Sequence, residues 1–110
     1  MAMAPSVPPV NVYEGNGQLS LATPIPGAHR DHTDVTVEPR RIRVRADCKY
    51  PQDGQRFLRR DWQVGSWVAD VDLPRGVDPG RAHARLSLGV LVVMAPLSDS
   101  GSGTSRPPVE

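Results

Sequence analysis

Short runs in which apolar and polar residues alternate recur along the chain, and glycine- or proline-containing breaks separate them. In the clearest run, residues 41–47, Ile42, Val44 and Ala46 alternate with charged residues. Strict alternation is typical of a β-strand with one buried face, and such strands belong to antiparallel sheets. The pattern therefore predicts antiparallel strands, and no run has a convincing helical period.

Eight short elements of this kind are predicted. Seven strands span residues 10–14, 18–23, 34–38, 41–47, 65–74, 84–88 and 90–96. The eighth is an amphipathic segment, 56–62, within a long connection from 49 to 64. Gly15-Asn16-Gly17 predicts a hairpin turn, and Gly89 separates the last two strands. The sequence thus predicts an all-β fold, an immunoglobulin-like antiparallel β-sandwich.

The inward positions of these strands supply the predicted core. In residues 65–74, Trp67, Ala69, Val71 and Leu73 alternate with polar residues, and Trp67 is the largest of them. The predicted core residues are Trp67, Val71, Leu73, Val90 and Leu91.

At 110 residues the chain fits one domain. We predict a Pro-rich N-terminal arm at 1–8, the folded domain at 9–96 and a flexible Ser/Gly/Pro-rich tail at 97–110. No run reaches the ~20 apolar residues of a membrane span. The N-terminus lacks the charged start and the apolar core that a signal peptide has. We therefore expect a cytoplasmic protein without a membrane partner.

Few residues suggest chemistry, and each has a simpler explanation. His29 and His32 lie in a polar loop without further ligands in view, so we predict no metal site. Asp70 and Asp72 are outward carboxylates of one strand, and no nucleophile has a His–Asp framework, so no catalytic residues are expected. The arginines of residues 41–45 are followed by Asp47, so nucleic acid is not an expected partner, and no cofactor is implied.

Residues 84–96 (Ala-Arg-Leu-Ser-Leu-Gly-Val-Leu-Val-Val-Met-Ala-Pro) resemble the closing signature of the alpha-crystallin domain of small heat shock proteins. That signature reads Ala-x-Leu-x-x-Gly-Val-Leu before a proline. Further segments similar to this family follow in the family's order: residues 9–14, 25–27, 34–37, 41–46, 57–62, 65–67 and 73–74. The chain departs from the family at Leu88, where asparagine is usual, in its short N-terminal arm, and in a tail without the Ile-x-Ile/Val motif.

The resemblance implies an ATP-independent chaperone, a holdase that binds unfolding clients and limits their aggregation under stress, and not an enzyme. It also implies a homodimer in which the connection 49–64 of one subunit pairs with residues 10–14 of the other. The implied dimer-interface residues are Val10, Val12, Tyr13, Phe57, Leu58 and Trp62. A groove for clients or peptides is implied at Val35, Val37, Ala84, Leu86 and Leu88.

The departures from the family leave two questions open. Because the tail motif is missing and the arm is short, we expect a dimer rather than a large oligomer. The same departures favour an alternative function, a non-chaperone interaction or scaffold module built on the same sandwich, such as a CS-domain-like adaptor or a gas-vesicle-associated member.

Overall fold

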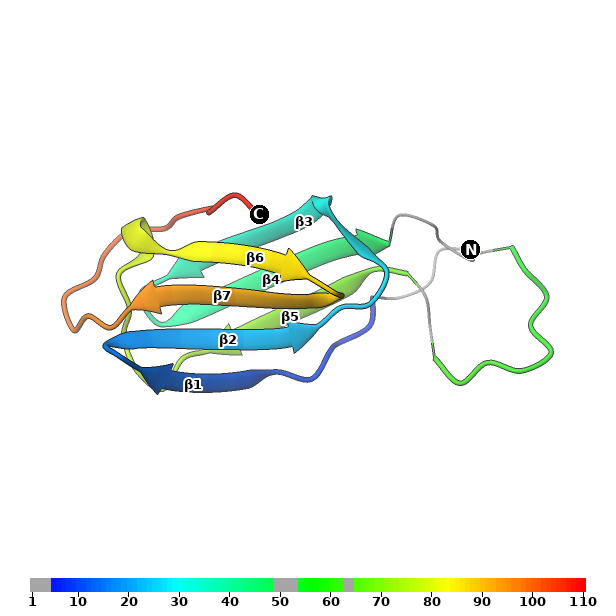
Figure 1. Ribbon diagram of the computed structural model, residues 1–110, viewed down its shortest axis with the longest axis horizontal. Coiled ribbons are helices and arrows are strands. Elements are labelled where there is room, and N and C mark those ends of the chain that lie inside the picture. The colour runs from blue at the N-terminus through cyan, green and yellow to red at the C-terminus, as the bar shows by residue number, and fades with distance from the viewer. Residues whose placement is uncertain (1–4, 49–53, 63–64) are drawn as a thin grey trace.

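Two antiparallel sheets pack face to face in the computed structural model, which describes residues 5–48, 54–62 and 65–110 (Figure 1). One sheet has the order β1-β2-β7-β6 and contains β1 (Asn11–Gly15), β2 (Gln18–Pro24), β7 (Val90–Pro96) and β6 (His83–Ser87). The other has the order β3-β4-β5 and contains β3 (Ala28–Glu38), β4 (Arg41–Cys48) and β5 (Trp67–Asp72). A short 3₁₀-helix, η1 (Pro79–Arg81), precedes β6. The predicted all-β sandwich is confirmed.

The two hairpins of the four-stranded sheet have the same kind of turn. In the β1–β2 turn, Asn16 and Gly17 have φ angles of 55° and 75°; in the β6–β7 turn, Leu88 and Gly89 have φ angles of 53° and 79°. Two consecutive positive φ angles are the geometry of a type I′ turn, whose twist matches that of the flanking strands. Asparagine tolerates this conformation, whereas leucine is strained in it.

Replacing Leu88 with asparagine should therefore stabilise the protein. The Leu88 side chain is fully exposed, so its removal sacrifices no packing. We expect the L88N variant to gain about 1 kcal/mol in free energy of unfolding, measured by urea denaturation. The opposite change at the equivalent turn position, Asn16→Leu, should lose a similar amount. An L88N variant less stable than the parent would contradict the assignment of strain to Leu88.

The core forms where the inner faces of the two sheets meet. The alternation predicted for β4 is confirmed, because Ile42, Val44 and Ala46 are buried while Arg43 and Arg45 are exposed. The other buried apolar residues are Leu19, Leu21, Ile25, Val35, Val37, Ala69, Leu73, Val77, Ala84, Leu91, Val93 and Ala95.

Two residues predicted to lie in the core are not fully buried in the structure. Val90 is 39% exposed, so its assignment to the core is wrong; Leu91, Val93 and Ala95 face inward instead. The run 90–93 is apolar throughout, and its sequence alone does not say which alternate positions face the core. Trp67 faces the core but is only partly buried, because it begins the edge strand β5. Its indole Nε1 donates a hydrogen bond to the carbonyl oxygen of Pro26 at 3.2 Å.

The other predicted core residues of β5 and the following loop agree better with the structure. Leu73 is buried, and Val71 is partly buried against the core.

β3 is longer than predicted, because it begins at Ala28 and includes an irregularity between Ala28 and Thr33, where we expected a loop. Residues 54–62 form no strand, so the described residues contain seven strands rather than eight.

The described part of the N-terminal arm lies along β5. Ser6 donates a backbone hydrogen bond to the carbonyl oxygen of Ser66, and its own carbonyl accepts one from the amide of Val68, both at 2.9 Å. Pro8 is buried, and the hydroxyl of Thr23 donates to the carbonyl of Pro9 at 2.8 Å. These contacts cover the sandwich where β5 begins.

Candidate functional site

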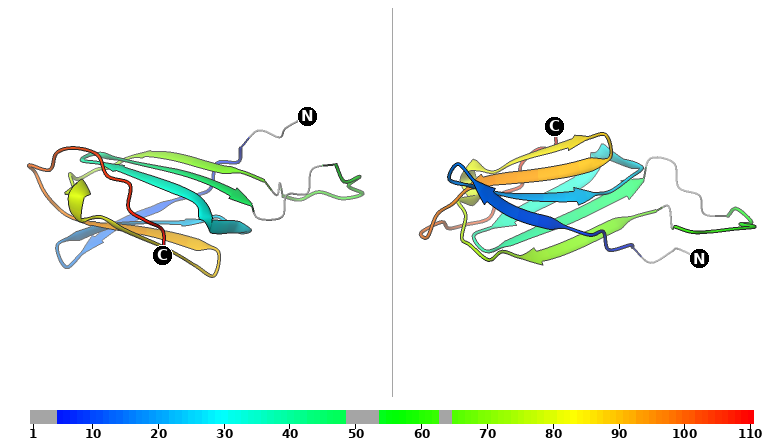
Figure 2. Two further views of the ribbon diagram at one scale, coloured as in Figure 1. Left: turned by 90° about the horizontal axis from the view of Figure 1, so that it is seen from above. Right: turned by 60° about the horizontal axis from the view of Figure 1, so that its bottom comes forward.

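The C-terminal residues run along the side of the sandwich between the edge strands β3 and β6, at the place of the predicted groove (Figure 2, left). Ser105 exchanges two backbone hydrogen bonds with Val37 of β3, each 2.9 Å long. The amide of Glu110 donates to the carbonyl of Ala84 at 3.0 Å, and the amide of Leu86 in β6 donates to the carbonyl of Glu110 at 2.8 Å. Residues 105–110, which we call the tail segment, thereby bridge the two sheets.

The side chains of the tail segment alternate between the groove and solvent. Ser105, Pro107 and Val109 are partly buried, whereas Arg106, Pro108 and Glu110 are exposed. Val109 packs against the core. The Oγ atom of Ser105 is buried and has no hydrogen-bond partner among the described residues. The tail predicted to be flexible and without packing thus packs in the groove as an extended segment held by isolated bridges.

Close backbone contacts at the end of the sandwich direct the chain into this groove. Leu97 pairs with Val77, and the amide of Ser98 donates to the carbonyl of Gly76 at 2.9 Å. A Cβ atom on Gly101 would lie 2.0 Å from the carbonyl oxygen of Val77. Since Val77 is fully buried, only glycine lets the chain pass so near.

Four of the five predicted groove residues lie beside the tail segment. Val35, Val37 and Ala84 are buried, and Leu86 is partly buried against the core. The predicted place of Leu88 in the groove is wrong, because Leu88 lies at the tip of the β6–β7 hairpin and is fully exposed. Its left-handed backbone conformation turns the chain out of β6, which ends at Ser87, and into β7.

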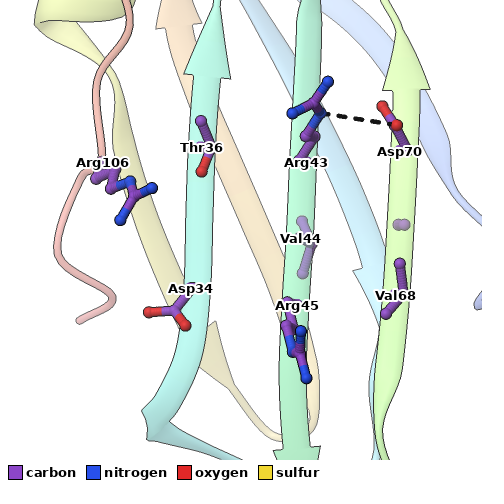
Figure 3. Close-up of a pocket in the computed structure, with 9 residues that line it drawn as sticks. Asp34, Thr36, Arg43, Val44, Arg45, Val68, Asp70 and Arg106 are labelled. Atoms are coloured by element: carbon purple, nitrogen blue, oxygen red, sulfur yellow. Dashed lines mark ion pairs between the residues drawn. The ribbon is translucent and has the colours of Figure 1, made fainter. Parts of the chain in front are cut away.

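The outer face of the β3-β4-β5 sheet is strongly charged and has an open hollow of about 330 Å³ (Figure 3). The hollow is lined by Asp34, Thr36, Arg43, Val44, Arg45, Val68, Ala69, Asp70 and Arg106. Arg106 comes from the tail segment and lies beside β3, while Arg43 of β4 forms an ion pair with Asp70 of β5 at 3.7 Å. Cations and carboxylates alternate across this face, so it offers no site of one charge.

Arg41 forms the strongest ion pair on this face. Its Nε and Nη2 atoms donate to the two carboxylate oxygens of Asp70 at 2.6 and 3.0 Å, and Asp72 lies 3.7 Å away. The hydrogen bond and charge of Asp70 raise the pKa of Arg41, because they favour its charged form. The predicted outward, solvated position of both carboxylates is confirmed.

The outer face of the four-stranded sheet has a different chemistry. In β1, β2 and β7 together Glu14 is the only charged residue, and it forms an ion pair with Arg75 at 3.0 Å. The cross-strand pairing of β1, β2 and β7 places Tyr13, Ser20 and Met94 side by side. It places Asn11, Ala22 and Val92 side by side in the same way. Tyr13 is 53% exposed, and Met94 and Val90 are each 39% exposed. We call this surface of β1, β2 and β7 the neutral face.

The predicted dimer-interface residues lie in two places. Val10 and Val12 are partly buried against the core, and Tyr13 is on the neutral face. Phe57, Leu58 and Trp62 lie on the segment 54–62, which projects beyond the end of the sandwich (Figure 1). Their exposed fractions are 37%, 92% and 59%. Within the single chain these two groups are not brought together.

The described residues offer little to a metal ion. The rings of His29 and His32 stand 5.9 Å apart, edge to face, and no group of three or more His, Cys, Asp or Glu side chains is arranged to hold a metal among the described residues. The thiol of Cys48 lies 3.8 Å from the carbonyl oxygen of Pro26. None of the described helices is long and apolar enough to cross a membrane.

The model of the Hsp20/alpha crystallin family matches residues 11–107. The chain belongs to this family. The match includes both sheets and most of the tail, and the family consists of non-enzymatic chaperones, which typically bind unfolded clients and self-associate.

Solved structures of small heat shock proteins share the fold. The chain resembles hspA from Xanthomonas axonopodis, with a TM-score of 0.73 at 24% identity over 91% of this chain and 100% of that one. It also resembles heat shock protein 16.0 from Schizosaccharomyces pombe, with a TM-score of 0.73 at 20% identity over 88% and 71% of the two chains. HSP18.5 from E. histolytica gives 0.71 at 19% identity over 86% and 92%. No curated protein sequence matches the chain.

Sequence reasoning missed the residues of the tail segment that fill the groove. Of the three inward positions, only Val109 carries a typical strand side chain; Ser105 and Pro107 are usual in turns. A small–x–Pro–x–Val pattern at the end of a Ser/Gly/Pro-rich stretch is too weak a signal to predict a strand.

Proposed function

We propose that the chain is an ATP-independent holdase that binds unfolding proteins and limits their aggregation in the stress response. The observation that carries this proposal is the amount of apolar surface left open on a sandwich of this family. It includes the neutral face and the exposed Leu88 beside it. Contiguous exposed apolar side chains on a folded protein mark sites of protein–protein contact.

Binding requires no energy source in this mechanism. An unfolding protein exposes apolar side chains, and these can pack on the neutral face. Anything that binds the unfolded state competes with aggregation by mass action. The charged outer face of the β3-β4-β5 sheet keeps the complex in solution.

We also propose that the chain forms a homodimer and no large oligomer, in which the segment 54–62 of one subunit lies along β1 of the other. The apolar side chains of this segment have little of their own sandwich to contact, and β1 is the free edge of its sheet among the described residues. Beside β1 lies a hollow lined by Val12, Tyr13, Glu14, Leu19, Pro74 and Arg75, with room for an incoming side chain.

Family members are generally soluble, and on that basis we propose a cytoplasmic location.

A light-scattering assay tests the holdase. A heat-labile client such as citrate synthase is warmed with and without the protein in about fourfold molar excess. We expect scattering to be suppressed without ATP and to a similar extent with it. A double variant of the neutral face, Val90→Lys with Met94→Lys, should suppress client aggregation less, because two charges replace exposed apolar side chains. The control is the double variant Arg43→Lys with Arg45→Lys on the charged face, which should suppress aggregation as well as the parent does. Absence of suppression by the parent protein would contradict the proposal.

A scaffold or adaptor module is the second candidate function, and one observation favours it. The tail segment already fills the groove at which a sandwich of this kind would accept a foreign strand. A protein with that groove filled could present only its outer faces, as an adaptor does. Failure to suppress aggregation, together with stoichiometric binding to one purified partner, would favour this function over the first.

A further inference from the structure

The edge strand β3 contains a bulge near its start that is held by its own side chains. Ala28 and Thr33 both pair with β4, whereas residues 29–32 between them lie opposite Asp47 alone. The hydroxyl of Thr33 donates a hydrogen bond to the carbonyl oxygen of His29 at 2.8 Å across this bulge. A bulge at a sheet edge interrupts the regular pairing of a strand. The contacts within residues 29–32 therefore decide the shape of the chain here.

The Nδ1 atom of His29 has two partners that require opposite protonation states. The backbone amide of Asp31 donates a hydrogen bond to Nδ1 at 3.2 Å, which requires Nδ1 to carry a lone pair. The carboxylate oxygen Oδ2 of Asp31 lies 3.5 Å from the same atom and attracts it only when Nδ1 carries a proton. The neutral ring therefore closes the bulge through the amide, whereas the charged ring pairs with the carboxylate.

Protonation of His29 also changes the balance of charge within the bulge. Arg30 lies 4.0 Å from the Asp31 carboxylate, so it competes with a charged His29 for that group. The ring of His32 stands 5.9 Å from the ring of His29, edge to face, and two charged rings at this distance repel each other. Uptake of protons thus removes the hydrogen bond that closes the bulge and adds repulsion between its two rings.

The charged groups that neighbouring elements direct toward the bulge are acidic. On β4 this group is Asp47, whose carboxylate already accepts a hydrogen bond from the hydroxyl of Ser66. The tail segment runs antiparallel to β3, so Glu110 lies toward the start of that strand. Both carboxylates attract a charged ring. Neither repairs the contact between Nδ1 and the Asp31 amide, because two donors face each other once the ring is charged.

We infer that residues 29–32 form a pH-dependent bulge, closed by the neutral ring of His29 and opened when that ring takes up a proton. Histidine side chains ordinarily change charge between about pH 5 and 8, so the bulge is closed at the upper end of this range and open at the lower end. In the open form the Asp31 amide is released to water. The inference depends neither on the proposed holdase function nor on the proposed dimer.

Nuclear magnetic resonance of the full chain tests both states. Correlation of ring protons with ring nitrogens should place the proton of His29 on Nε2 at about pH 8 and protons on both nitrogens at about pH 5. The protection factor of the Asp31 amide, which corrects for the intrinsic pH dependence of exchange, should fall about tenfold over the same interval. Amides of the central strand β4 should keep their protection, which shows that the sandwich stays folded.

His29→Asn separates protonation of this ring from other effects of acid. The asparagine side-chain oxygen accepts a hydrogen bond from the amide two residues later, as in an Asx turn, and takes up no proton. The Asp31 amide of this variant should therefore be equally protected at both pH values. His32→Asn is the matched control, because it removes the neighbouring ring but keeps Nδ1 of His29. Its Asp31 amide should still lose protection in acid.

Three results would each overturn the inference. The neutral ring of His29 could carry its proton on Nδ1, which excludes the hydrogen bond from the Asp31 amide. The Asp31 amide of the parent could be equally protected at both pH values. His29→Asn could lose that protection in acid as the parent does, which would place the titrating group elsewhere. None of these measurements uses a client, so failure of the holdase proposal leaves their meaning unchanged.

Discussion

The double variant Phe57→Asp with Trp62→Ala should sediment as a monomer at concentrations at which the parent chain is a dimer. Both aromatic side chains are exposed on the projecting segment, at 37% and 59%, and the proposed dimer buries them against a second subunit. Aromatic residues at the centre of an interface each contribute about 2 kcal/mol or more. Losing both should raise the dissociation constant by about 10³-fold. Analytical ultracentrifugation over a concentration series measures this directly.

Gln55→Asp is the matched control for that variant. It adds the same negative charge to the same exposed segment but leaves the aromatic side chains intact, so the dimer should persist. The double variant removes only exposed side chains, so its unfolding transition should stay close to that of the parent once the contribution of dimerisation is removed. A parent protein that is already monomeric would contradict the proposed dimer, and a double variant that stays dimeric would place the interface elsewhere.

Replacing Gly101 with alanine should detach the tail from the end of the sandwich. The added Cβ would stand 2.0 Å from the carbonyl oxygen of Val77, which is fully buried, so the tail and not the core has to move. We expect the amides of Leu86 and Ser105 to lose their protection from exchange and the free energy of unfolding to fall by about 1–3 kcal/mol, the usual cost of overpacking.

The neighbouring change Ser102→Ala controls for an altered tail sequence. Ser102 is exposed, and the change removes only its hydroxyl group, so both the exchange of Leu86 and the stability should match the parent. If Gly101→Ala kept full protection at Leu86, the close passage of the tail beside Val77 would be wrong, and the route of the chain into the groove with it.

The outer faces of the two sheets differ in how well alternation along the strands predicts them. The charged face of β4 could be predicted, because Arg41, Arg43 and Arg45 alternate with small or branched apolar residues. The neutral face could not. The run 90–93 is apolar throughout, so burial of Leu91 and exposure of Val90 depend on the register with β2 and on which face meets the other sheet.

The fold class, the family resemblance and most of the strands follow from the amino-acid sequence alone. These depend on local properties: alternation along single strands, the Gly-Asn-Gly and Leu-Gly turns, and short segments in a fixed order. Tertiary structure alone decided which edges meet and what lies between them. The tail segment has no strand pattern of its own; it is held because β3 and β6 offer unpaired backbone groups side by side and Gly101 brings the chain to them. A contact between residues so far apart in sequence depends on the geometry of both sheets, which no single stretch of the chain encodes.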